Sequence, residues 1–187
     1  MGVERTMRRL CNTLLAGLEL PSSATTVDLF AALCARMSQE RSRRVTFQLV
    51  HFPTTSSVSG LWLNLDGQDL LAVERHTDPS HQCVIFGHEV WHMYQGQCRP
   101  GGQEAVLATR LLAGKVDLES AKDAVLRVAA RTHFDNETEE READAFGYRL
   151  STRCRPLLRP SADGSRTPRD ALARRIEAAL GHRGPQE

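Results

Sequence analysis

The chain has 187 residues, 41% of them hydrophobic, and a formal net charge of +1 at pH 7. This length and composition allow one sizeable hydrophobic core and leave little room for a second full domain. No apolar run approaches the roughly 18 residues that a membrane-spanning helix needs, so we expect no such helix. We therefore expect a single domain over residues 1–187 with no membrane partner.

Cysteine usage and the N-terminal stretch bear on the compartment. The five cysteines show neither paired metal-binding spacing nor a regular disulfide framework, as expected of reduced thiols. The N-terminus has basic residues before an apolar patch, but Asn12 and Glu19 interrupt the patch and no convincing cleavage site follows. We therefore expect a cytoplasmic protein.

Two helices and then three strands are predicted in the first part of the chain. Apolar residues recur at helical spacing in residues 4–18 and 27–41, which a Pro-Ser-Ser turn separates. Three short β-branched or alternating runs follow, divided by turn residues, which is typical of an antiparallel meander. The three runs cover residues 45–52, 60–65 and 69–74. We expect both helices to pack on the core that contains this sheet.

The next predicted helix carries the most informative pattern of the chain. Asp78 followed by Pro79 is a good N-cap and first-turn pair, so the helix should begin there and end near Gly96. Within it, His88 and His92 are four residues apart and therefore share one face of the helix.

The segment HEVWH, which these two histidines enclose, has the His-Glu-x-x-His pattern of zinc peptidases. Both imidazoles can bind one Zn²⁺ ion, while Glu89 lies beside them and near a bound water. The same pattern can occur on an ordinary amphipathic helix with solvated histidines, so a third ligand is needed. His81 shares the face but lies almost two turns before His88, too far along the axis to bind the same ion. We expect His81 to have a rim or capping role.

Residues 136–150 supply a candidate for the third ligand. If this segment is helical, Glu140, Ala143, Asp144 and Gly147 form one stripe in which two acidic and two small residues alternate. Small residues allow another helix to approach closely. Glu140 could then complete a His, His, Glu set, and Asp144 could accept the remaining N–H of a ligating histidine. By itself the segment is typical of a solvated acidic helix, but its combination with HEVWH favours a metal site.

The two motifs resemble those of known zinc peptidases. His-Glu-x-x-His followed by Glu-x-x-Ala-Asp is similar to the pattern of gluzincin peptidases. The flanking IFGHEVWHMYQG and EREADAFG resemble the ImmA/IrrE metallopeptidase family, over roughly residues 45–151. The resemblance implies an α+β, zincin-like fold. In that fold, a small antiparallel three-stranded sheet packs against the HExxH helix and a second ligand-bearing helix, with the N-terminal helices alongside.

The resemblance also implies roles for residues of this chain. His88, His92 and Glu140 would be the protein ligands of one Zn²⁺ ion per chain, and Glu89 would be the catalytic base. The family more often has Asn at the position of Asp144, and a leucine-rich helix where this chain has VWHMY.

Domain organisation follows from these assignments. The chain would comprise N-terminal helices (1–43), a catalytic core (44–152) and a basic C-terminal extension (153–187). The separation of the two motifs is long for the family, which indicates a helical insertion at about 103–131. Acidic residues dilute the arginines of the extension and no aromatic residues are interleaved with them, so we expect no direct nucleic-acid binding.

Other assignments of the same residues are possible at the site. A metzincin needs Gly and His where this chain has Gln95 and Cys98, which argues against that class. Cys98 is nevertheless a possible substitute ligand, because thiolates bind zinc well.

His133, Tyr94 and Tyr148 are candidate oxyanion donors because they are close to the motifs in the sequence.

These observations predict a zinc-dependent endopeptidase. Zinc would lower the pKa of water toward about 7, so that Glu89 can accept its proton. The substrate would be a peptide or protein that pairs with an exposed strand edge, and the resemblance implies a helix-turn-helix repressor or antitoxin. The alternative is a regulatory or toxin-component protein that keeps zinc for partner binding without proteolysis, an alternative suggested by unusual helix residues such as Trp91.

Overall fold

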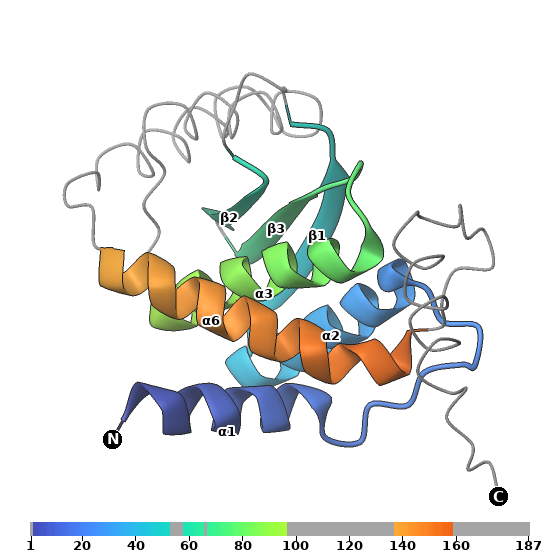
Figure 1. Ribbon diagram of the computed structural model, residues 1–187, viewed down its shortest axis with the longest axis horizontal. Helices are drawn as coiled ribbons and strands as arrows, with labels where there is room; N and C mark the ends of the chain where they lie inside the picture. Colours follow the sequence, from blue (N-terminus) through green and yellow to red (C-terminus); the bar gives the residue numbers. More distant parts are fainter. Residues whose placement is uncertain (1, 53–57, 66, 97–136, 159–187) are drawn as a thin grey trace, which may run out of the picture.

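The computed structural model describes residues 2–52, 58–65, 67–96 and 137–158 (Figure 1). This part of the chain is an α+β structure, as predicted. Its helices are α1 (Val3–Leu15), α2 (Thr26–Arg41), α3 (Pro79–Gln95), α6 (Glu137–Cys154) and the short 3-10 helix η1 (Arg155–Leu157). Its strands are β1 (Arg44–Val50), β2 (Gly60–Leu65) and β3 (Gln68–Glu74). The expected insertion at about 103–131 and most of the C-terminal extension lie outside the described residues.

The strands form a mixed sheet in the order β1-β3-β2. β2 and β3 are antiparallel, but β1 runs parallel to β3, so the predicted antiparallel meander is wrong at β1. Alternation of apolar residues shows which face of a strand is buried, but not which strand lies beside it. β3 is the central strand, and its residues Leu71, Ala72 and Val73 are buried consecutively, on both faces of the sheet.

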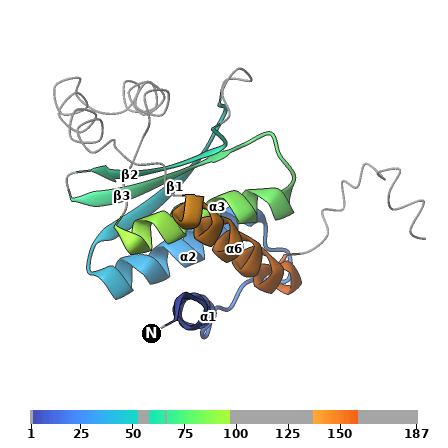
Figure 2. The ribbon, with the colours of Figure 1, turned by 60° about the vertical axis from the view of Figure 1, so that its left-hand side comes forward.

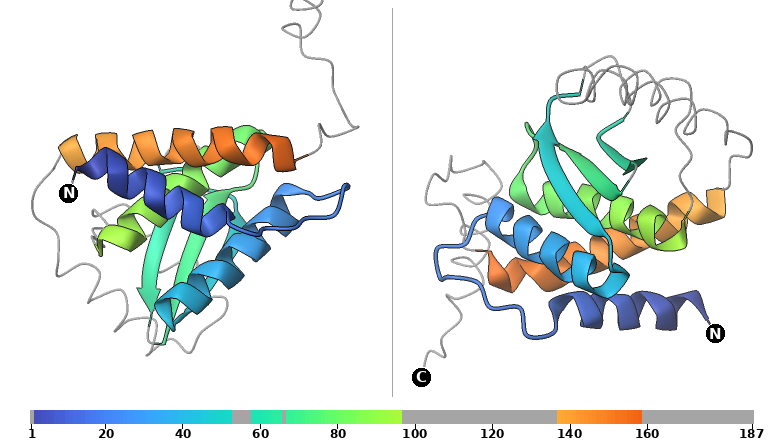
Figure 3. Two further views of the ribbon diagram at one scale, coloured as in Figure 1. Left: turned by 90° about the horizontal axis from the view of Figure 1, so that it is seen from below. Right: turned by 180° about the vertical axis from the view of Figure 1, so that it is seen from behind.

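The helices lie on one face of this sheet (Figure 2). α2 packs on β1, and α3 packs on β2 and β3. α6 lies across α3, and α1 runs alongside α6 in both views of Figure 3. The core between sheet and helices includes Phe30 and Phe86, whose rings are stacked with centroids 4.2 Å apart. None of the helices in the described ranges is long and apolar enough to cross a membrane.

Helix α3 begins and ends where the sequence predicts. Asp78 Oδ1 accepts hydrogen bonds from the backbone N–H groups of Ser80 and His81, each at 3.0 Å. Pro79 occupies the first turn, where its missing N–H costs nothing. At the other end, Gly96 has a φ of 70°, the left-handed conformation that commonly closes a helix. Local chemistry therefore sets the register of the histidines on α3.

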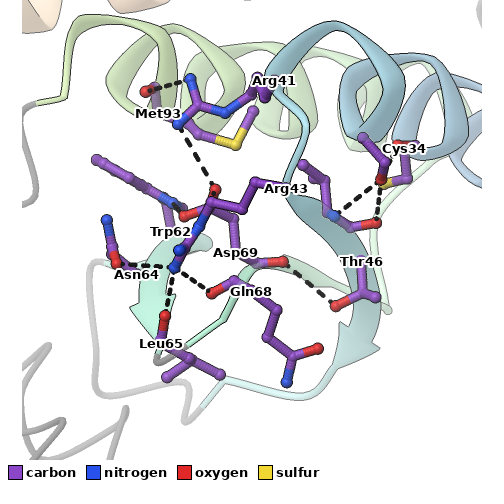
Figure 4. A network of polar contacts seen from close by, with 12 residues as sticks. Cys34, Arg41, Arg43, Thr46, Trp62, Asn64, Leu65, Gln68, Asp69 and Met93 are labelled. Carbon is purple, nitrogen blue, oxygen red and sulfur yellow. Dashed lines mark hydrogen bonds and ion pairs between the residues drawn. The ribbon is translucent and has the colours of Figure 1, made fainter.

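A buried carboxylate fixes the end of the sheet that faces the C-terminus of α3 (Figure 4). Asp69 is fully buried, and its oxygens lie 3.1 Å from Arg43 Nε, 3.6 Å from Arg41 Nη2 and 3.1 Å from Trp62 Nε1. Arg41 also approaches the Met93 carbonyl oxygen at 3.5 Å. Arg43 also donates hydrogen bonds to three oxygen atoms around the β2–β3 turn, on Asn64, Leu65 and Gln68. Since a buried charge is stable only when paired, this network links the end of α2 and the residue before β1 to the β2–β3 hairpin and α3.

Candidate metal centre

Helices α3 and α6 are in backbone contact at two glycines. A Cβ atom on Gly147 would lie 2.5 Å from the Val84 carbonyl oxygen and 3.2 Å from the His88 backbone nitrogen. A Cβ atom on Gly87 would lie 2.8 Å from the Gly147 Cα atom. Ala143, one turn before Gly147, is fully buried in the same contact face. The small residues of α6 therefore permit the close helix approach that their spacing predicts.

This contact brings Glu140 over the two histidines of α3. Glu140 Oε2 lies 3.4 Å from His88 Nε2, and Glu140 Oε1 lies 3.5 Å from His92 Nε2. The two histidine Nε2 atoms are 2.9 Å apart. A tetrahedral zinc site with bonds of about 2.0–2.2 Å places its ligand atoms about 3.3 Å apart. The three side chains therefore have nearly the separations that one zinc ion requires, and together they could hold a metal ion.

Asp144 orients one of these histidines. Its Oδ1 atom lies 2.9 Å from His88 Nδ1. Because an ionised carboxylate only accepts hydrogen bonds, Nδ1 must be the donor. In the neutral ring, the lone pair is then on Nε2, which faces Glu140 and His92. The structure thus places Asp144 where it fixes the tautomer and the direction of an imidazole that could bind a metal ion.

The protonation states of the cluster reflect its negative charge. Burial by itself lowers the pKa of His88, but its hydrogen bond to Glu140 and the nearby charge of Glu89 raise this pKa to about 9. The hydrogen bond to Asp144 acts in the same direction. Hydrogen bonds to His88 and His92 hold the pKa of Glu140 far below its usual value. The site therefore keeps its carboxylate ionised and stabilises positive charge, which is the electrostatic requirement for a cation.

Glu89 occupies the side of α3 that faces the sheet. It is 8% exposed, and a Cβ atom on Gly60 would lie only 2.6 Å from its Oε1 atom. Gly60 is the first residue of β2, so the carboxylate lies directly against the beginning of this strand. Gly60 was not predicted from the sequence to be part of the site. Its signal is a glycine within a strand pattern, which often marks a close approach of another group.

The tyrosines proposed as oxyanion donors lie away from the cluster. Tyr94 is 48% exposed, and its ring stacks on Trp91 with centroids 6.0 Å apart. Its position on α3 is rotated by about 140° around the helix axis from that of the histidine pair, so its hydroxyl is on a different side of the helix. Tyr148 is 64% exposed and two turns after Glu140, about 12 Å along α6. Neither tyrosine adjoins the three candidate ligands.

The remaining candidates are also separate from the cluster or cannot be placed. His81 is exposed in the first turn of α3, about 10 Å along the axis from His88, which agrees with a position outside the metal site. His133 and Cys98 lie outside the described residues. No family model, curated protein or solved structure matches this chain.

Proposed function

We propose that this protein is a zinc-dependent endopeptidase with a zincin-like arrangement of its site. The observation that carries the proposal is the convergence of His88, His92 and Glu140, with Glu89 beside them on the same helix. Two imidazoles and one carboxylate suit zinc, and three protein ligands leave a fourth coordination position open. The side chain of Glu140 is 63% exposed, so solvent reaches this side chain of the group.

The chemistry divides between the metal and the protein. Bound Zn²⁺ would supply Lewis acidity, which lowers the pKa of water and polarises a carbonyl group. Glu89 would accept a proton from the attacking water and donate it to the leaving amine, acting first as base and then as acid. Burial beside Gly60 holds its carboxylate in one place for both transfers. Asp144 would keep His88 in the metal-binding tautomer throughout.

Strand β2 is the sheet edge that could hold a substrate. Within the described sheet, β2 is an edge strand and pairs with β3. β2 packs on α3 and begins at Gly60, against Glu89. An extended peptide paired with β2 would therefore pass close to the general base, and its main chain rather than its side chains would supply most of the hydrogen bonds. The family resemblance makes a helix-turn-helix repressor or antitoxin the proposed substrate.

The test separates zinc binding from proteolysis. Glu89→Gln preserves the shape of the side chain but removes the base, so we expect normal zinc content and no cleavage. Glu137→Gln is the matched control, because it makes the same chemical change at an exposed position of α6. Zinc would be measured by mass spectrometry of the purified protein, and cleavage by the new N-termini produced in a proteome-derived peptide library.

Two results would contradict the proposal. Identical new N-termini from wild type and Glu89→Gln would show that Glu89 is not the base. Absence of zinc-dependent cleavage by the wild type, combined with normal biological activity of Glu89→Gln, would instead support the non-proteolytic alternative, in which zinc serves partner binding.

A further inference from the structure

A second group of potential metal ligands lies at the carboxyl ends of β1 and β3. His51 follows β1, Glu74 ends β3, and His76 lies in the turn that leads to α3. β1 and β3 are parallel, with Val50 paired to Glu74, so their ends meet at one edge of the sheet. One ligand atom from each of the three side chains lies within 4.8 Å of the other two.

The two histidines face the carboxylate and each other. His51 Nδ1 lies 3.6 Å from Glu74 Oε1. The rings of His51 and His76 meet edge to face, with centroids 4.9 Å apart. The imidazoles thus approach the same carboxylate from two segments that are far apart in the sequence.

Glu74 is held in place by the backbone on both sides. Its Oε2 atom accepts a hydrogen bond from the Phe52 N–H at 2.8 Å, and its Oε1 atom accepts one from the His76 N–H at 2.7 Å. Burial by itself raises the pKa of Glu74, but these hydrogen bonds and that to His51 lower it overall. The carboxylate is therefore ionised and oriented by the protein alone. The two backbone N–H donors belong to His76 itself and to Phe52, the residue after His51. The Glu74 carboxylate therefore also positions both histidines.

We propose that His51, Glu74 and His76 form a second site for a divalent transition-metal ion, with Zn²⁺ as the reference ligand. Two imidazoles and a carboxylate are the donor set that zinc and neighbouring transition metals accept. The 3.6 Å separation of His51 and Glu74 is close to the tetrahedral value of about 3.3 Å. Further contraction needs movement of the histidines only, and the side chain of His51 is 59% exposed.

The second site is separate from the first and does not depend on the proposed proteolysis. His88 lies nine residues after Pro79, about 14 Å along α3 from its first turn, so one ion cannot bind both groups. Arg75 carries the nearest positive charge in the sequence, but its guanidinium donates to the Leu49 carbonyl oxygen at 3.1 Å and is engaged with β1. A metal here would hold the ends of two strands to the turn that leads into α3.

Zinc binding by the full chain tests the site directly. In a His88→Ala/His92→Ala background, which removes the first site, equilibrium dialysis against buffered Zn²⁺ should leave one bound equivalent. Adding His51→Ala should raise the free Zn²⁺ needed for half-saturation by more than about tenfold, since it removes a direct ligand. Adding His81→Ala, another exposed histidine that lies outside both groups, should leave it unchanged.

The proposal is overturned if the background variant binds no zinc although circular dichroism shows that it is folded. It is also overturned if His51→Ala and His81→Ala change the free Zn²⁺ needed for half-saturation equally. If the background variant does not fold, the wild type and His51→Ala/His76→Ala are compared instead. The side chains changed there are exposed, and the expected result is a loss of one zinc equivalent with normal folding. An unchanged stoichiometry would refute the site. In either case the cleavage test above remains independent.

Discussion

The glycine contact between α3 and α6 makes a sharp prediction for Gly147→Ala. The added Cβ atom would lie 2.5 Å from the Val84 carbonyl oxygen, and Cβ atoms are essentially never found within 3.0 Å of another atom. α6 must therefore move by at least about half an ångström, because a packed backbone cannot yield in the way a flexible side chain does. Metal sites tolerate errors of only about 0.2 Å in ligand distance. The methyl group should thus disturb both the helix packing and the position of Glu140.

The change in the free energy of unfolding on Gly147→Ala is a balance of two effects. Overpacking costs up to about 3 kcal/mol, while replacing glycine by alanine in a helix contributes about 1 kcal/mol of stability. We therefore expect Gly147→Ala to lower the free energy of unfolding by about 2 kcal/mol and to weaken zinc binding at the first site by at least about tenfold. Urea unfolding and zinc dialysis measure the two quantities.

Ala145→Gly provides the matched control on the exposed side of the same helix. It should destabilise the protein by about 1 kcal/mol through helix propensity alone and leave zinc affinity unchanged. Unchanged or increased stability of Gly147→Ala, together with normal zinc affinity, would show that the helices are not in backbone contact and would refute the reasoning.

Other perturbations test separate parts of the structure. Asp144→Ala should weaken zinc binding by about 10–100-fold by releasing the ring of its histidine partner, measured by dialysis; an unchanged affinity would exclude the orienting role. Asp69→Ala should lower the free energy of unfolding by about 3–5 kcal/mol, because it leaves two arginines without their buried partner; a loss below about 1 kcal/mol in urea would contradict this. The pKa of His88 is raised to about 9 in the metal-free protein, so its contribution to stability is complete below its ordinary pKa of 6.5 and is lost as the pH rises toward 9. Urea unfolding of metal-free wild type and His88→Gln should therefore differ less at pH 9 than at pH 6, whereas a constant difference would argue against the shift. Gly60→Ala should displace Glu89 and reduce cleavage while leaving zinc content normal, and loss of zinc in a folded variant would contradict that separation.

Some features of this protein follow from the sequence because they depend on residues close together in the chain. Spacing of four residues puts His88 and His92 on one helix face wherever the helix packs. Asp78 with Pro79 and the later Gly96 set the ends of that helix through backbone hydrogen bonding and a left-handed turn.

Other features were decided only by the tertiary structure. The parallel pairing of β1 with β3 was not predictable, because a strand's pattern of apolar residues shows its buried face but not its neighbour. The place of Glu89 against Gly60 depends on how α3 meets β2, and the pattern of neither element contains that information.

The same division holds for the two groups of side chains that could hold a metal ion. The first was predictable because its motif places two ligands one helical turn apart, and the small residues beside Glu140 indicated a helix contact that could bring the third. The second was not, because His51 is more than twenty residues from its partners, and the alternating pattern around it shows only that its side chain is on the exposed side of the strand. Only the pairing of two parallel strands brings their ends, and therefore these side chains, together.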